Sequence, residues 1–228
     1  MKAPVPVRPE PGKPNATRIV LVDDHPIVRD GLADAINHEA DLAVCATAED
    51  RAEAMDAIER AKPGLAVIDL MLKSSSGLEL IKDVHARWPR LLILVVSMHD
   101  ETLYAERVLR AGARGYITKQ QATRDILLAI RRVLGGGIYL SEKTASTVLS
   151  RLTSQPELAG DMIADRLADR ELQVFEMTGR GLSTREIAEH LRIDMKTVDT
   201  YRTRIKEKLA LDSTGDLLKL AIRWNQER

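Results

Sequence analysis

The sequence predicts an α/β unit built on a five-stranded, parallel, doubly wound sheet, followed by a second unit of four helices. Up to about residue 140, short apolar runs rich in Val, Ile and Leu alternate with stretches whose apolar residues recur at helical spacing. Beyond that point no strand pattern follows and only helical stretches remain. At 228 residues the chain is long enough for two domains of ordinary size.

The first unit is expected to hold five strands that alternate with five helices, and right-handed crossovers place such helices on both faces of a parallel sheet. The first strand is expected at 18–22, and the helix after it begins at Pro26, because the first turn of a helix does not use the N–H that proline lacks. The other strands are expected at 42–46, 65–71, 91–97 and 115–117. The other helices are expected at 52–61, 78–88, 101–111 and 123–134.

Composition sets the expected domain boundaries. Residues 1–16, where Pro and Gly are frequent, are expected to form a mobile tail, and the α/β unit is expected to cover 17–140. Residues 141–165 are expected to be a linker that contains one helix. The second unit, 166–228, is expected to hold helices at 169–178, 184–191, 195–209 and 214–224. Ser183 and Ser213 with an acid three residues later predict capping boxes, and Asp194 is expected to cap the third of these helices.

Charge and cysteine content exclude several classes of protein. The formal net charge is zero, so any nucleic-acid site must be local. The single cysteine, Cys45, excludes an internal disulfide and suits a reducing compartment. No apolar run approaches the roughly 18 residues of a membrane span, and the start of the chain is unlike a secretory signal. We therefore expect a soluble, cytoplasmic protein.

Polar side chains follow the expected strands at one edge of the sheet. Asp23 and Asp24 end the first strand, Asp69 lies near the end of the third, Ser97 ends the fourth and Lys119 follows the fifth. Each alone could be a loop cap or a solvated charge, but the carboxyl ends of parallel strands meet where ligands bind. Mg²⁺ prefers carboxylate and phosphate oxygens, and a lysine neutralises phosphoryl oxygens. The five residues together predict a magnesium-dependent phosphoryl site in which Asp69 is the nucleophile.

With Tyr116 added, these residues resemble the receiver domain of a two-component response regulator, which has a flavodoxin-like fold. The resemblance covers residues 17–135, and the Asp-Asp-His-Pro and Ser-Met-His-Asp stretches are typical of the NarL/FixJ type. It implies that a histidine kinase phosphorylates Asp69. It also implies that Asp24, Asp69 and the Met71 carbonyl bind Mg²⁺ directly and that Asp23 binds it through water. Ser97 and Tyr116 are implied to form a switch, in which the hydroxyl moves to the phosphate and the ring turns inward.

Two positions depart from the family, which often has proline where this chain has Lys73 and Gln120. Without that second proline, a cis peptide after Lys119 is not expected, and the triple serine 74–76 predicts a flexible loop after Asp69. The competing class is an aspartate-nucleophile phosphohydrolase, which needs a second aspartate two residues after its nucleophile. Met71 occupies that position, so the chain is not expected to be an enzyme. A regulator whose receiver no longer depends on phosphate stays open as an alternative.

Residues 167–224 resemble the LuxR-type helix-turn-helix, through Gly181-Leu182-Ser183, Glu186-Ile187-Ala188, Lys196-Thr197-Val198 and Thr200-Tyr201-Arg202. Helical spacing places Val198, Tyr201, Ile205 and Leu209 on one buried stripe of the third helix. Such a charged helix could be only a solvated face, but the two-helix framework predicts that it enters the DNA major groove. The expected DNA contacts are Ser183, Thr184, Lys196, Thr197, Asp199, Thr200, Arg202, Thr203, Arg204 and Lys206.

Asp199 departs from the lysine that the family commonly has, and a carboxylate accepts a hydrogen bond from the cytosine N4 amino group. We therefore expect an altered base preference at that position. One recognition helix reads few bases, so a homodimer on paired half-sites is expected. In the family the last helix supplies the apolar dimer surface, here Leu217, Leu218, Leu220 and Ala221, although some of these must be core.

Overall fold

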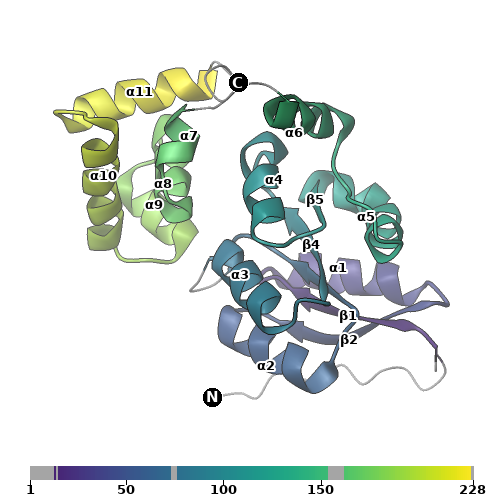
Figure 1. Ribbon diagram of the computed structural model, residues 1–228. Helices are drawn as coiled ribbons and strands as arrows, with labels where there is room; N and C mark the ends of the chain where they lie inside the picture. Colours follow the sequence, from purple (N-terminus) through teal and green to yellow (C-terminus); the bar gives the residue numbers. More distant parts are fainter. Residues whose placement is uncertain (1–12, 14, 73–75, 154–161, 227–228) are drawn as a thin grey trace. The chain divides into compact units, whose positions relative to one another are not determined.

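The computed structural model describes residues 13, 15–72, 76–153 and 162–226 (Figure 1). The chain divides into two compact units, residues 1–150 and 151–228. Lys73, where the sequence departs from the family, lies outside the described residues, as do Ser74, Ser75, residues 154–161 of the expected linker and all but residues 13, 15 and 16 of the expected tail. Among the described residues no helix is both long enough and apolar enough to cross a membrane.

The first unit contains a five-stranded parallel sheet with the strand order β2-β1-β3-β4-β5. The strands are β1 (Thr17–Val22), β2 (Leu42–Ala48), β3 (Leu65–Ile68), β4 (Leu92–Ser97) and β5 (Gly115–Thr118). The helices between and after them are α1 (Pro26–Asn37), α2 (Arg51–Ala61), α3 (Gly77–Arg87), α4 (Glu101–Arg110) and α5 (Lys119–Leu134). The doubly wound fold is confirmed, and its order makes β1, β3 and β4 neighbours.

Alternate strand residues pack on α1 and α5, which lie side by side over one face of the sheet (Figure 1). Leu32 and Ile36 of α1 and Ile126 and Ile130 of α5 belong to this core. The strands themselves are buried on both faces, since Ile19 to Val22 are each at most 1% exposed. This explains why they are continuous apolar runs and do not alternate with polar residues.

Two boundaries of the first unit differ from the prediction. The third strand ends at Ile68 and not at Met71; the Asp69 N–H still donates to the Val22 carbonyl at 2.8 Å, and the chain then turns away. The fifth helix begins at Lys119 and not at Thr123, because Thr118 and Gln121 form a capping box. Its signal, a threonine three residues before a glutamine, is present in the sequence. Lys119 is therefore the first residue of α5.

The second unit is made of helices. A short α7 (Met162–Arg166), which the sequence did not predict, precedes α8 (Asp169–Gly179), α9 (Thr184–Leu191), α10 (Met195–Leu209) and α11 (Thr214–Gln226). Its core includes Phe175 of α8, whose ring meets the Trp224 ring edge-on at 5.4 Å between centroids. The helix α6 (Glu142–Thr153) spans the boundary between the two units.

The helix caps of this unit follow the prediction in two of three cases. Ser183 and Glu186 form the predicted capping box, and the Asp216 N–H donates to Ser213 Oγ at 3.1 Å. Asp194 occupies the N-cap position of α10, but its side chain makes no capping hydrogen bond, so that prediction is wrong. In α11 Leu217 and Ala221 are fully buried, whereas Leu218 is exposed. The core therefore takes two of the four residues considered for a dimer surface.

Candidate functional site

Three buried carboxylates meet at the carboxyl edge of the sheet, as the sequence predicted. Asp23 and Asp24 follow β1, and Asp69 follows the neighbouring β3; their exposed fractions are 3%, 9% and 2%. Carboxylate oxygens of these residues and a ring nitrogen of His25 lie within 4.8 Å of one another. The pairing of β1 with β3 brings the acids together. Val22, the last residue of β1, lies beside Ile68, the last residue of β3, and the acids follow these two residues in the chain.

His25 is a member of this cluster that the sequence reading missed. Its Nδ1 lies 2.8 Å from Asp24 Oδ1 and 3.2 Å from Asp23 Oδ1. The signal was present, since the histidine directly follows the two acids in the chain. The His25 side chain is 55% exposed, whereas the side chains of Asp23 and Asp24 are each 5% exposed.

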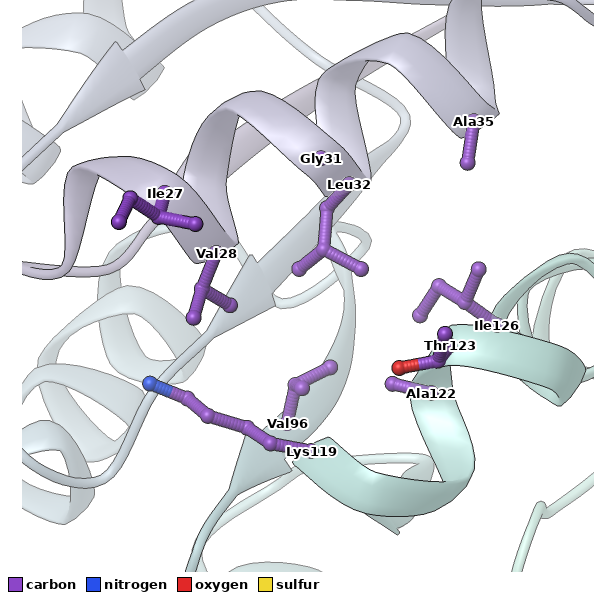
Figure 2. A pocket seen from close by; sticks show the side chains of 10 residues that line it. All are labelled: Ile27, Val28, Gly31, Leu32, Ala35, Val96, Lys119, Ala122, Thr123 and Ile126. Carbon is purple, nitrogen blue, oxygen red and sulfur yellow. The ribbon is translucent and has the colours of Figure 1, made fainter.

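Lys119 binds two of the three acids from the first turn of α5. Its Nζ lies 2.7 Å from Asp23 Oδ2 and 2.7 Å from Asp69 Oδ2. The aliphatic stem lines a cavity of about 310 Å³ between α1 and α5, and Figure 2 shows the amino group directed away from that cavity. Apolar side chains such as Val28, Leu32 and Ile126 form most of the cavity wall. Lys119 is thus held by apolar neighbours along its methylene groups and by two ion pairs at its ammonium group.

Burial and charge act in opposite directions on these groups. Burial raises the pKa of Asp69 to about 6, with a further upward push from Asp23, although the Lys119 ammonium lowers it. Burial would lower the pKa of Lys119, but attraction to Asp69 and Asp23 outweighs it, so this pKa is raised. The cluster therefore sets three carboxyl groups against one ammonium, that of Lys119. The donor set suits a hard divalent cation, because carboxylate oxygens are the ligands that Mg²⁺ prefers and the excess negative charge needs a cation.

Ser97 and Tyr116 are both fully buried and both bind His99 in the loop between β4 and α4. Ser97 Oγ accepts a hydrogen bond from the His99 N–H at 3.4 Å, and the Tyr116 hydroxyl donates to the His99 carbonyl at 3.0 Å. The resemblance implied a ring that turns inward on phosphorylation. In this structure the Tyr116 side chain is already fully buried.

The two remaining receiver positions, Met71 and Gln120, follow Asp69 and Lys119 within two residues in the chain. The Met71 N–H donates to Asp69 Oδ1 at 3.2 Å, so the backbone at Met71 lies against the acid. Gln120 is the second residue of α5 and continues the helix. The described residues contain no cis peptide bond, and the bond after Lys119 is trans.

The recognition-helix candidate α10 buries the face that the spacing predicted. Val198 and Ile205 are fully buried against the rest of the second unit, and Tyr201 and Leu209 are partly buried. The opposite face carries exposed side chains: Lys196, Asp199, Thr200, Thr203 and Arg204. Ser183, just before α9, is also exposed, while Thr197 and Lys206 are half-buried.

Arg202, one of the residues expected to contact DNA, is directed toward α8 and α9 in this structure. Its guanidinium donates to Thr184 Oγ1 at 2.6 Å and to Thr178 Oγ1 at 3.5 Å, and burial lowers its pKa. Arg202 therefore joins α10 to α8 and α9. Thr184, another expected DNA contact, is its partner. The two lie close together because Arg202 falls beside the buried stripe and not opposite it.

Two family descriptions together cover most of the chain. "Response regulator receiver domain" matches residues 19–131, and "Bacterial regulatory proteins, luxR family" matches residues 165–221. The oxygen regulatory protein NreC of Staphylococcus aureus (strain MRSA252) is 34% identical over 210 residues, covering 90% of this chain and 97% of that protein. The chain is a member of the two-component response regulators with a LuxR-type DNA-binding domain.

Solved structures share the fold of this response regulator. A two-component response regulator of the LuxR family from Aurantimonas sp. SI85-9A1 is 32% identical, with a TM-score of 0.56 over 61% of this chain and 99% of that chain. RcsB from Salmonella enterica serovar Typhimurium, solved on the P1flhDC promoter with the phosphomimetic BeF3-, is 24% identical. Its TM-score is 0.60, covering 91% of this chain and 98% of that chain. In the response regulator described above, the acidic cluster lies in the receiver domain and α10 in the LuxR-type domain.

Proposed function

We propose that this response regulator accepts a phosphoryl group from a histidine kinase on Asp69 and that phosphorylation controls DNA binding by the LuxR-type domain. One observation carries the proposal. Asp69 lies buried beside two further carboxylates with its Oδ2 held 2.7 Å from the Lys119 ammonium. A carboxylate in that setting is a positioned nucleophile with a cation ready for the incoming oxygens.

The proposed transfer uses the groups of this chain in definite roles. A carboxylate oxygen of Asp69 attacks the phosphorus of a phosphohistidine, so that an O–P bond forms as the P–N bond breaks. The kinase imidazole leaves and takes up a proton. Lys119 releases Asp69 Oδ2 and donates to a phosphoryl oxygen while keeping its contact with Asp23, 2.7 Å away. Because its pKa is about 6, Asp69 is mostly ionised at neutral pH and available for attack.

The acidic cluster is proposed to hold Mg²⁺. Asp24, Asp69 and the Met71 carbonyl would bind the ion directly and Asp23 through water, which the convergence of the carboxylates within 4.8 Å supports. The bound ion would supply positive charge for the phosphoryl oxygens. The protein residues orient the nucleophile and exclude solvent around it.

Ser97 and Tyr116 are proposed to transmit the phosphorylated state. The Ser97 hydroxyl would turn to bond the phosphoryl group and give up its contact with the His99 N–H. Because Tyr116 binds the carbonyl of the same residue, the loop before α4 and the tyrosine would respond together. This is a bistable element biased by a new charge-assisted bond.

The DNA-binding part of the proposal rests on α10. Lys196, Asp199, Thr200, Thr203 and Arg204 would face the major groove, and Ser183, Thr197 and Lys206 would contact phosphates. Between residues 196 and 208 the chain has five basic and two acidic residues, so a neutral protein keeps a local cationic element. Exposed Leu218 and Ile222 on α11 would supply a contact between two copies on paired half-sites.

The test combines phosphorylation with DNA binding. Incubation with acetyl phosphate and Mg²⁺ should add one phosphoryl group to the wild-type protein and none to Asp69→Asn, as measured by intact mass. DNA binding measured over a series of salt concentrations should be tighter for the phosphorylated protein, and Asp69→Asn should not respond. No mass gain on Asp69, or no binding to any DNA, would contradict the proposal.

A second candidate function is DNA binding that does not depend on phosphate. The observation that favours it is Tyr116, whose ring is fully buried and bonded to the His99 carbonyl before any phosphate is present. If Tyr116 is already buried without phosphate, phosphorylation would change the receiver's conformation little. Equal DNA affinity with and without the phosphoryl group would select this candidate over the first.

A further inference from the structure

Three exposed side chains at the centre of α10 are hydrogen-bond acceptors toward solvent. The Thr200 hydroxyl donates its proton to the Lys196 carbonyl at 2.9 Å, and the Thr203 hydroxyl donates to the Asp199 carbonyl at 3.0 Å. A hydroxyl has one proton, so each oxygen presents only lone pairs outward. Asp199, which directly precedes Thr200, adds an exposed carboxylate that accepts only.

Met195 extends this surface with an apolar group. It is the first residue of α10, four residues before Asp199 and therefore on the same side of the helix, and it is 54% exposed although apolar. We call Met195, Asp199, Thr200 and Thr203 together the acceptor face.

Arg202, one turn after Asp199, does not add an outward-facing donor to the acceptor face. Arg202 is turned toward Thr184 and Thr178, and Lys208 is bound to Glu171 with its Nζ 2.6 Å from Oε2. Lys196, one turn before Asp199 and Thr200, is the exposed donor at the start of the helix, and Arg204 lies one turn after Thr200. Guanine O6 and N7 are both acceptors and are read by Arg or Lys, so Asp199 and the two threonines offer them no donor, and the exposed donors Lys196 and Arg204 lie one turn to either side.

The base edges that fit the acceptor face are those with amino and methyl groups. Cytosine N4 and adenine N6 are the major-groove donors, and the thymine 5-methyl group takes apolar contacts. A guanine opposite Asp199 would set its O6 lone pairs against a carboxylate. The phosphates of the backbone repel the same carboxylate, so a base amino group is the contact that suits it.

We propose that the acceptor face selects cytosine or adenine at the base beside Asp199 and thymine at the base beside Met195, and disfavours guanine at the Asp199 position. The inference deepens the DNA-binding function proposed above and rests on it. It assigns Asp199 and Met195 as specificity-determining residues and Arg202 as a residue that positions α10.

The experiment begins with selection of bound duplexes from a random pool by the full-length, phosphorylated protein. In the selected site, the base beside Asp199 is replaced by an analogue without its amino group, 2-pyrimidinone for cytosine or purine for adenine. Wild-type affinity should fall about tenfold, the lower part of the range for one base contact, and Asp199→Ala should not distinguish the two duplexes. Replacing the thymine by uracil removes the methyl group, which should weaken the wild type by about threefold and leave Met195→Ala unchanged.

Asp199→Lys should change the selected base to guanine at the same position, because it puts a donor where the acceptor was. Asp212→Ala, which removes an exposed acid outside α10, is the matched control and should keep the wild-type site. Specific binding with guanine beside Asp199, unchanged in Asp199→Lys, would overturn this inference and leave the proposed function intact. Failure of the phosphorylated protein to bind any duplex would overturn both.

Discussion

At the scale of single residues, the site is a balance between burial and charge. Asp69 is 2% exposed, and the Lys119 ammonium offsets its charge directly, at 2.7 Å. The raised pKa of Asp69 records that the offset is incomplete. Further positive charge should therefore stabilise the ionised form of Asp69. The affinity for a cation and the stability of the receiver domain should both depend on the ionisation of this carboxyl group.

The first residue-scale prediction concerns pH. Mg²⁺ and a proton compete for Asp69, whose pKa is about 6 in the absence of metal. Below that pH the carboxyl group is neutral and binding is weak; affinity should rise by up to about tenfold per pH unit between pH 5 and 6 and level off above pH 7. Calorimetry at several pH values should also show proton release near pH 6. Asp69→Asn should bind more weakly and without this step, and a flat wild-type profile would contradict the assignment.

The second residue-scale prediction concerns Lys119. Lys119→Met keeps an apolar stem against the cavity between α1 and α5 but removes the charge, leaving Asp23 and Asp69 without their cation. Unfolding in urea at pH 7 without Mg²⁺ should show a loss of about 3 kcal/mol, as expected for a broken buried pair. The loss should shrink below pH 6, where Asp69 takes up a proton. Lys119→Ala also removes the apolar part of the side chain and should lower the free energy of unfolding further. An equal loss in Lys119→Ala and Lys119→Met would show that packing of the side chain plays no part.

At the scale of elements, the receiver binds the segment that leads into α6. The Tyr116 N–H donates to the Tyr139 carbonyl at 2.9 Å, and the Tyr139 N–H donates to the Arg114 carbonyl at 3.1 Å, so this segment pairs with the edge of β5. Glu101, the buried first residue of α4, accepts a hydrogen bond from the Ser141 N–H at 2.7 Å. Ser141 in turn caps α6, because the Thr144 N–H donates to its hydroxyl at 3.3 Å.

The prediction for these elements is a local release of α6. Glu101→Ala removes the acceptor of the Ser141 N–H and should lower the free energy of unfolding of the receiver domain by about 1–3 kcal/mol. Hydrogen exchange should rise at residues 139–145 more than in β1 or β3. Glu101→Gln keeps an acceptor oxygen and is the matched control. Equal protection of that segment in Glu101→Ala and the wild type would show that the contact does not hold α6.

At the scale of the whole molecule, the proposed function places two copies of the chain on paired half-sites of DNA. The prediction is that Leu218→Lys places a charge on the exposed surface of α11 and weakens self-association on paired half-sites by at least about tenfold, since an apolar contact is replaced by an unpaired ammonium. Sedimentation with one-site and two-site duplexes would measure this. Lys219→Ala, at the exposed neighbouring residue, should behave as the wild type. Unchanged cooperativity in Leu218→Lys would place the dimer contact elsewhere.

Much of this molecule could be predicted from local patterns. The buried strands showed as apolar runs, and Asp23, Asp24, Asp69 and Lys119 could be placed at one edge because parallel strands share it. The start of α5 was missed although Thr118 and Gln121 signal it, and His25 was missed although it follows the acids. Both signals are short: a threonine three residues before a glutamine, and a histidine directly after two acids. Such short patterns also occur often where they form no helix cap and no cluster.

Apart from α7, the sequence by itself determined the order of the elements, the two domains of the family and the acids that meet in the receiver, because periodicity and strand ends are local properties. Only the tertiary structure decided that Arg202 turns inward to Thr184, that Tyr116 is already buried, and that Leu217 and Ala221 belong to the core. The direction of a side chain beside a buried stripe depends on the neighbour that packs against it. That neighbour is distant in the sequence, so no local pattern contains it.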